Sequence, residues 1–493
     1  HGRPRGPARP RSSRAGRRLA EIALPWALAL ACAHDPRSGR AQDGSFAWRY
    51  RVDVPAALDR LGVEVCFTGP PPRRLVIDDD DAAAVDAVGD LKADGGTPRL
   101  DPDSGSIVLG KLPDGACVRY SVALDRLIDG ADSRQTARFG DVVAVEPRLV
   151  LWRPATLYHE AEIEAELRLA PGVASSVSWE PLGADRYRVP VTALMWASQA
   201  MFGPLVKQRV EAAGATFDVA IVDRPRKLSE AGLARWLSTA ADTVAGLYGA
   251  FPTERMQVTI VPFPGAAGPV YFGMALRGGG PAVVLLVASE APDHAFPGEW
   301  VAIHEFLHHG MPFVRHADAW LSEGFVTYYT EVLPTRRGFR SEQAGWDALE
   351  DGFVRGRRDG TGLTLAEESR DMHETHSYQR VYWGGAAIAL LVDVALRLGG
   401  GGRSLDEGMR QLLRCCARTP RVWPADAVLR ELDTWAGRPF FAELAAAWLR
   451  TSEFPALQDT YRKLGVDVIK GELTLNETAP AADVRRAIFA RPP

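Results

Sequence analysis

The residues best suited to chemistry in this sequence are two histidines and a glutamate within one short stretch. His304 and His308 lie four residues apart, which on an α-helix places both imidazoles on the same face, one turn apart. Two imidazoles so placed can hold one zinc ion, and Glu305 can then reach a water molecule on that metal. The alternative is a helix in which the histidines have only a structural role.

The flanking residues favour a helix with its own start and stop. Pro297 suits the first helical turn, Gly310 suits the position just past the end, and Pro312 forbids continuation. The pattern predicts a helix over roughly 297–309. On this helix His309 is turned by about 100° from its neighbour, so we do not expect it to bind the same ion.

A third metal ligand is needed, because a catalytic zinc takes three protein ligands and leaves one position for water. The best candidate is Glu323, within the run Trp-Leu-Ser-Glu-Gly-Phe at 320–325. A predicted helix over roughly 319–333, with Asp318 as its cap, can fold back on the first helix. Gly324 weakens such a helix unless something approaches it closely, and a metal centre would supply that reason.

Length and composition describe an ordinary globular protein of more than one domain. The chain has 493 residues, of which 46% are hydrophobic and 24% charged. Its net charge of −4 gives no reason to expect nucleic acid as a partner. Alternating strand-like runs come first and helical patterns follow, which predicts a multidomain α+β protein.

The changes in pattern along the chain predict five segments. Residues 1–41 are expected to form a leader of export or lipoprotein type with a disordered segment, and residues 42–220 a β-sandwich-like domain. We expect a catalytic domain at 221–400, a helical C-terminal region at 401–470 and a tail at 471–493.

The first residues have the layout of an export signal. Seven arginines and no acid precede Glu21, and the run Ile22–Ala33 is apolar and ends in small residues. Cys32 closes the run Leu-Ala-Leu-Ala-Cys, which resembles a bacterial lipoprotein cleavage box, so this cysteine is a candidate lipid anchor to a membrane. We expect an exported protein that is periplasmic, envelope-bound or secreted; the alternative is a disordered basic tail.

Two other cysteines, Cys66 and Cys117, lie in strand-like runs of the predicted β domain. A disulfide between them is feasible outside the cytoplasm, and the sequence leaves this pairing open.

Three motifs in order give a resemblance to a known family. They are His-Glu-x-x-His at 304–308, Trp-Leu-Ser-Glu-Gly-Phe at 320–325 and Tyr-x-x-Gly at 382–385. Together they resemble the gluzincin zinc metallopeptidases, most of all the glycyl aminopeptidase family, with the membrane alanyl aminopeptidases as wider relatives. The glycyl family often ends in a PDZ domain, and this chain stops before one could fit.

The resemblance implies a thermolysin-like α+β zinc catalytic domain and a role for each matching residue. His304, His308 and Glu323 would bind zinc, Glu305 would be the general base, and Tyr382 would donate a hydrogen bond to the developing oxyanion. The substrate would be a peptide or protein.

Two departures from the family's pattern bear on the activity. Fourteen residues separate His308 from Glu323, fewer than is usual in these families. The family's exopeptidases anchor the substrate's amino group with a glutamate in a Gly-x-Met-Glu-Asn-like strand, where this chain has Ala275. We therefore expect a zinc metallopeptidase that acts as an endopeptidase. The alternative is a catalytically inactive or weakly active, surface-anchored binding protein on the same scaffold.

Overall fold

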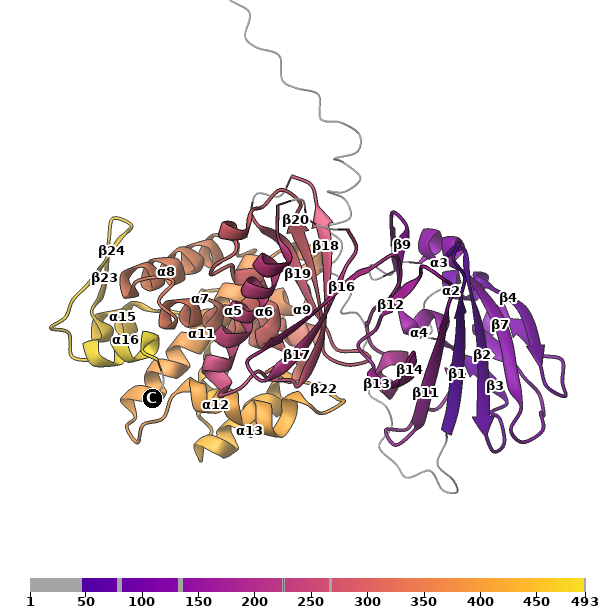
Figure 1. Cartoon of the computed structure of the whole chain (residues 1–493). Coiled ribbons are helices and arrows are strands. Elements are labelled where there is room, and N and C mark those ends of the chain that lie inside the picture. The colour runs from indigo at the N-terminus through magenta and orange to yellow at the C-terminus, as the bar shows by residue number, and fades with distance from the viewer. Residues whose placement is uncertain are drawn as a thin grey trace, which may run out of the picture.

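The computed structural model describes residues 47–77, 82–131, 136–223, 225, 227–265 and 268–491. The predicted leader and the candidate lipid anchor Cys32 lie outside these residues. A β-rich part comes first in the chain, and a mixed sheet covered by helices follows it (Figure 1). The mixed α+β organisation and the helical C-terminal region expected from the sequence are confirmed.

The N-terminal part is built from a seven-stranded sheet and two four-stranded sheets. The large sheet has the order β13-β14-β11-β1-β2-β7-β4, with bounds Glu180–Gly183, Arg186–Arg188, Glu162–Leu169, Ala47–Val54, Arg60–Thr68, Cys117–Ala123 and Val88–Ala93. One small sheet has the order β10-β3-β6-β5, with bounds Arg153–Pro154, Arg74–Val76, Ser106–Val108 and Arg99–Asp101. The other has the order β12-β15-β9-β8, with bounds Ala174–Ser176, Ala200–Gly203, Val142–Val145 and Ala137–Phe139.

Alternating residues explain how these sheets share a core. In β1, Trp48, Tyr50, Val52 and Val54 are buried, and the residues between them are more exposed. Their side chains pack in one cluster with apolar residues from the small sheets. The large sheet therefore has one buried face.

The second part contains a five-stranded mixed sheet with the order β16-β17-β18-β20-β19. Its strands are Val206–Ala212, Ala215–Ile221, Arg255–Phe263, Ala282–Ala288 and Val270–Leu276 in that order. Every residue of β20 is apolar, as expected for a strand that is covered on both faces. Val283, Leu285 and Val287 face the main helical core, while the residues that alternate with them face a smaller cluster.

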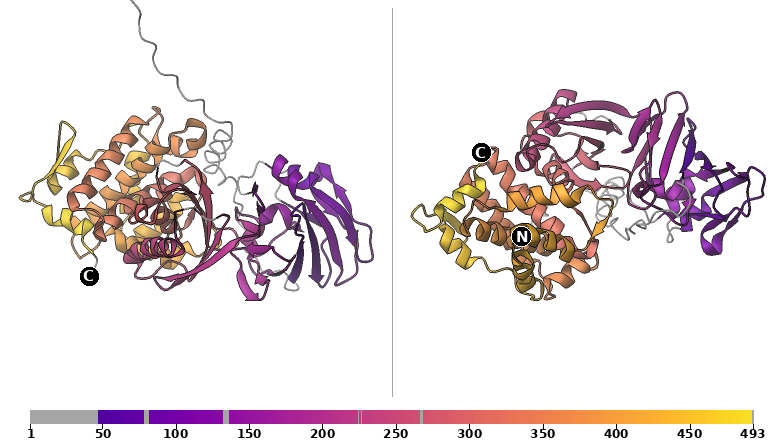
Figure 2. Two further views of the ribbon diagram at one scale, coloured as in Figure 1. Left: turned by 45° about the horizontal axis from the view of Figure 1, so that its top comes forward. Right: turned by 90° about the horizontal axis from the view of Figure 1, so that it is seen from below.

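Helices cover one face of this sheet and continue to the C-terminal end of the described chain. The longer ones are α5, α6, α7, α8 and α11, at Glu230–Tyr248, Trp300–His308, Ala319–Arg336, Glu342–Arg358 and Tyr378–Leu398. The shorter ones are α9, α10, α12, α13, α14, α15 and α16, at Leu365–Arg370, Met372–Thr375, Leu405–Leu412, Ala425–Ala436, Phe440–Leu449, Gln458–Leu464 and Ala482–Phe489. Figure 2 shows the C-terminal helices at the end of the molecule farthest from the N-terminal sheets.

Two of the predicted segment limits differ from the structure. The boundary expected at residue 220 falls too late, because β16 pairs with β17 and β17 pairs with β18, so both strands belong to the second sheet. The segment 471–493 is not simply a tail: α16 packs into the main core, where Arg485 is fully buried and its guanidinium bonds Glu342 and the carbonyl of Asn476. Alternation of residue types identifies a strand but does not say which sheet it joins.

α11 is the one described helix that is long and apolar enough to cross a membrane, and 72% of its most apolar window is buried inside the protein. Its Asp393 is fully buried and accepts hydrogen bonds from the Tyr328 hydroxyl and the Leu405 amide. These contacts are those of a core helix packed between α7 and α12.

Cys66 and Cys117 face each other on β2 and β7 and form a disulfide across 51 residues of sequence. A second bridge joins the neighbours Cys415 and Cys416. Replacing both Cys66 and Cys117 by alanine is expected to lower the free energy of unfolding by about 2–4 kcal/mol, since the bridge restricts the unfolded chain. Urea denaturation of the oxidised protein and the double variant measures this, and equal midpoints would contradict it.

Candidate metal centre

α6 carries the two histidines, and its start differs from the sequence prediction. The helix begins at Trp300 rather than near Pro297, and Glu299 is its N-cap, with a carboxylate that accepts hydrogen bonds from the amides of Val301 and Ala302. Burial raises the pKa of Glu299 to about 7. A glutamate is not among the common capping residues, which is why the sequence pointed to the proline instead.

β19 lies directly against α6. A side chain at Gly273 would meet Glu305 and Val301 at 2.6 Å, so only glycine allows the strand to pass this close to the helix. Ala275 follows two residues later on the same edge strand, paired with Val283 of β20.

α7 carries Glu323 and crosses α11 at a pair of glycines. A Cβ at Gly324 would lie 2.3 Å from the Cα of Gly385, and one at Gly385 would lie 1.9 Å from the carbonyl oxygen of Trp320. The close approach anticipated at Gly324 is therefore made by a neighbouring helix. It brings the start of α11, with Tyr382, beside Glu323.

The start of α7 also differs from the prediction. Asp318 does not cap the helix with its side chain; its carboxylate instead accepts from Arg315 and from the amide of Ala425. Farther along α7, the Tyr328 hydroxyl donates a hydrogen bond to Asp393 and the Tyr329 hydroxyl donates one to Asp406, both at 2.8 Å. These buried bonds fix α7 against α11 and α12.

The structure brings His304, His308 and Glu323 together. The Nε2 atoms of the two histidines are 3.3 Å apart, and each is 3.3 Å from the same carboxylate oxygen of Glu323. Tetrahedral zinc with bonds of about 2.0–2.1 Å needs donor atoms about 3.3–3.4 Å apart, so this triangle fits three corners of such a site. The short connection between His308 and Glu323 is long enough to close it.

The charge state of Glu323 suits a metal ligand. Burial acts to raise the pKa of this carboxyl, but the imidazoles of His308 and His304 outweigh burial and hold the pKa well below its usual range. The side chain is only 12% exposed. It is therefore an enclosed carboxylate whose negative charge is directed at the two histidines.

Thr330, which the sequence reasoning missed, orients His304. The Thr330 hydroxyl donates to the carbonyl of Val326 at 2.8 Å, so toward His304 Nδ1, 3.2 Å away, it can only accept. Nδ1 of His304 therefore carries a proton, and when the imidazole is neutral the lone pair of Nε2 points into the triangle. Thr330 lies seven residues after Glu323 on the same helix face, and that spacing was the signal available in the sequence.

Glu305 lies between the histidines in sequence but faces β19. Burial raises its pKa to about 7, with Glu323 and Glu299 adding to the rise and His304 and the amide of Ala275 opposing it. A carboxyl with a pKa near neutrality can both take and release a proton under physiological conditions.

Tyr382 is also at the centre. Its ring stacks on that of His304, with centroids 6.2 Å apart and planes at 10°. Burial and the charges of Glu323 and Glu305 raise the pKa of its phenol well above the usual value. The phenol therefore keeps its proton at neutral pH and can donate a hydrogen bond.

His309 is turned away from the triangle, as expected from helical geometry. Its ring is buried, and Nε2 lies 3.2 Å from the carbonyl oxygen of Ala282 on β20. Trp300, one turn before His304 on α6, is 52% exposed, and its ring is edge-on to that of His304 with centroids 6.0 Å apart.

Neither the known family models nor the curated proteins give a match to this sequence. Solved structures do match, at low sequence identity. An aminopeptidase N family protein from Idiomarina loihiensis superposes with a TM-score of 0.65 at 16% identity, covering 85% of this chain and 78% of its own.

Two further structures are similar over most of the chain. An M1 zinc metallopeptidase from Deinococcus radiodurans gives a TM-score of 0.53 at 18% identity and covers 85% of this chain and 96% of its own. Yeast LTA4 hydrolase gives 0.53 at 14% identity, with coverages of 87% and 74%. At these identities the comparisons show the fold, and the three-helix centre described above lies within it.

Proposed function

We propose that this chain, which has the fold of the M1 zinc metallopeptidases, is itself a zinc-dependent peptidase. The observation that carries the proposal is the triangle of donor atoms from His304, His308 and Glu323, with Glu305 and Tyr382 beside it. A related M1 zinc metallopeptidase from Deinococcus radiodurans has been solved with a Tyr-Ser-Ala substrate, at a TM-score of 0.54 and 17% identity, which supports a peptide as the substrate.

His304, His308 and Glu323 would hold zinc, which when bound lowers the pKa of water to about 7 and polarises the scissile carbonyl. The Glu305 carboxylate takes the proton of the attacking water and passes it to the leaving amine. The Tyr382 phenol donates a hydrogen bond to the oxyanion that develops on the carbonyl. Thr330 keeps the imidazole of His304 in the tautomer that can bind metal.

Replacing Thr330 by valine keeps the shape of the side chain but removes the acceptor for His304 Nδ1. We expect zinc affinity to fall by about 10–100-fold, because the imidazole loses the contact that fixes its tautomer and orientation. Competition with a fluorescent chelator measures the change. Thr239→Val is the control, because it also removes a threonine hydroxyl from a helix, in α5. Unchanged affinity in Thr330→Val would contradict the role given to this hydroxyl.

We further propose that the enzyme cleaves within peptides rather than at a free amino terminus. The position expected to carry an amine-binding glutamate is Ala275, and a methyl group cannot pair with an ammonium. Two acids that precede α6 in the sequence have other partners: Glu299 caps α6, and Asp293 bonds Ser229 and Arg235 beside α5. The alanine at position 275 also favours the alternative, which is a binding protein that has kept the scaffold without efficient catalysis.

Zinc analysis of the purified protein and digestion of a peptide library with blocked and unblocked amino termini test these proposals together. We expect one zinc per chain and cleavage of the blocked peptides. Metal-free protein would overturn the peptidase proposal. Zinc-loaded protein that cuts no peptide would favour the binding protein, and cleavage restricted to unblocked peptides would overturn only the endopeptidase proposal.

We also propose that the protein is exported, and that Cys32 is a candidate lipid anchor. The basic and apolar layout of the first residues supports export, as does the disulfide between Cys66 and Cys117, which persists in an oxidising compartment. Intact-mass measurement of the mature protein from the cell envelope tests this. A cleaved chain with a lipid on Cys32 supports the anchor, cleavage without lipid supports simple export, and an uncleaved chain in the cytoplasm would contradict both.

A further inference from the structure

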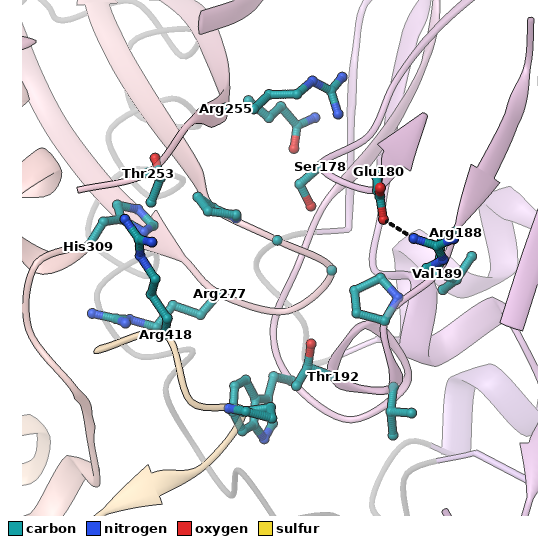
Figure 3. A pocket seen from close by; sticks show the side chains of 18 of the residues that line it. Ser178, Glu180, Arg188, Val189, Thr192, Thr253, Arg255, Arg277, His309 and Arg418 are labelled. Carbon is teal, nitrogen blue, oxygen red and sulfur yellow. Dashed lines mark hydrogen bonds and ion pairs between the residues drawn. The ribbon is translucent and has the colours of Figure 1, made fainter. Parts of the chain in front are cut away.

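A cavity of about 700 Å³ lies between the N-terminal sheets and the second sheet (Figure 3). The N-terminal part contributes residues around Ser178, Arg188 and Thr192. The second part contributes the start of β18, the turn after β19 and the loop before β22 (Val422–Trp423). The five residues of the metal centre are not among the described residues that line this cavity. The cavity is therefore lined by residues other than those five, and it comes nearest to them at His309 and at Arg277, which bonds the carbonyl of His308.

The lining of the cavity carries an excess of positive charge. Four arginines and two glutamates face it, namely Arg188, Arg255, Arg277, Arg418, Glu180 and Glu254. Two of the arginines are neutralised: Arg188 pairs with Glu180 at 2.7 Å, and Arg255 pairs with Asp218 behind the lining. Among the described residues, Arg277 and Arg418 have no acidic partner and Glu254 forms no ion pair, so these two cations and one anion leave the lining with a net positive charge.

Arg277 is the more enclosed of the two. Its Nη2 donates to the carbonyls of His308 and Met311, at the C-terminal end of α6, and its guanidinium lies 5.6 Å from the centre of the Phe313 ring. Within the described residues its Nε and Nη1 make no hydrogen bond, and it has no carboxylate partner. Burial lowers the pKa of Arg277 to about 10, so the side chain still carries its charge at neutral pH.

Arg418 lies on the same side of the cavity, as Figure 3 shows. One of its Nη atoms donates to the carbonyl of Pro252 at 2.8 Å, and the residue as a whole is exposed. Apolar side chains form much of the remaining wall, among them those of Trp196, Phe313 and Met256. A ligand that matches these surfaces has one anionic group and an apolar body.

We propose that the cavity between the two parts binds a small organic anion, a carboxylate or phosphate attached to an apolar group, through Arg277 and Arg418. Such an anion supplies the missing counter-charge, because a guanidinium can hold a carboxylate or phosphate by two parallel hydrogen bonds. The cavity is within the size range of small-molecule sites. The proposal does not depend on peptidase activity.

Isothermal titration calorimetry of the zinc-loaded protein with benzoate, phenyl phosphate and neutral benzamide tests the proposal. We expect at least one of the two anions to bind and benzamide not to bind. The preferred anion identifies the ligand as a carboxylate or a phosphate. Failure of both anions to bind, or equal binding of benzamide, would overturn the proposal.

Arg418→Gln and Arg277→Gln are each expected to weaken anion binding by about tenfold or more, because each removes one charged partner. Arg414→Gln is the control, since this exposed arginine does not line the cavity. If the Arg277→Gln variant fails to fold, the Arg418→Gln variant still tests the proposal, because Arg418 is exposed. Binding that survives the Arg418 substitution would place the anion elsewhere, at the metal centre for example, and would overturn the assignment.

Discussion

Replacing Glu305 by glutamine is expected to lower kcat for peptide cleavage by about 10²–10⁴-fold while zinc stays bound, because the amide cannot accept a proton. The three donor atoms of the metal site belong to other residues, so the substitution leaves the triangle of His304, His308 and Glu323 unchanged. Glutamine has nearly the same size and shape as glutamate. This matters because the side chain at position 305 packs closely against Gly273.

Steady-state kinetics on a blocked peptide, together with zinc analysis of the same sample, measure this effect. Glu290→Gln is a suitable control, because Glu290 is an exposed glutamate that pairs with Lys227 at the surface. Full activity of the Glu305 variant would overturn the assignment of this residue as the base. If the variant loses its zinc, the lost activity says nothing about proton transfer, and the residue is instead needed to keep the metal in place.

Replacing Tyr382 by phenylalanine is expected to have the second large effect. We expect kcat to fall by about 10²–10³-fold and KM to change little. The phenol contributes one hydrogen bond to charge that exists only in the transition state, and removing one such donor has an effect of this size. The ring itself remains stacked on His304, so the metal site should keep its geometry.

Measuring kcat and KM separately distinguishes this role from a structural one. A general loosening of the centre would raise KM and reduce zinc content, whereas loss of the donor affects kcat alone. Tyr187→Phe, in β14 of the N-terminal sheet, removes a phenol hydroxyl away from the centre and is the matched control. An unchanged kcat in Tyr382→Phe would remove this residue from the mechanism.

The histidine helix could be predicted from the sequence because its signal is local. His304 and His308 lie on the same face of a helix however that helix packs against its neighbours. Their imidazoles therefore come together whenever the segment is helical. Glu323 is different. It was found through its motif, and its place beside the histidines depends on α7 folding back over α6 and on the contact between Gly324 and Gly385.

α7 also shows why Thr330 was missed. The helix is buried on nearly every side, so it has no polar stripe to mark the face that meets α6. A threonine in such a helix resembles any other buried small residue until the packing is known. The same applies to the cavity between the two parts, whose walls come from seven separate stretches of sequence.

The helix starts and segment limits were wrong for a related reason. Glu299 caps α6 with a longer side chain than the usual capping residues, and Asp318 is engaged by Ala425, more than a hundred residues away. α16 was not foreseen because a segment of eight residues contains little periodicity, and its main anchor is a buried arginine. Contacts distant in sequence decided the cases of Asp318 and α16, whereas the cap of α6 is a local contact made by an unusual residue.

The residues proposed for the chemistry and the position proposed to set the choice of substrate end lie on different elements. All five residues of the metal centre lie on α6, α7 and α11, whereas position 275 lies on β19 at the edge of the sheet. Under the proposed function, a different side chain at position 275 can alter which peptides are accepted while the residues of the metal centre stay the same. Gly273 on the same strand lacks this freedom, because a side chain there would meet Glu305. If the proposed function holds, single substitutions at position 275 can change selectivity while the three helices of the metal centre keep their residues.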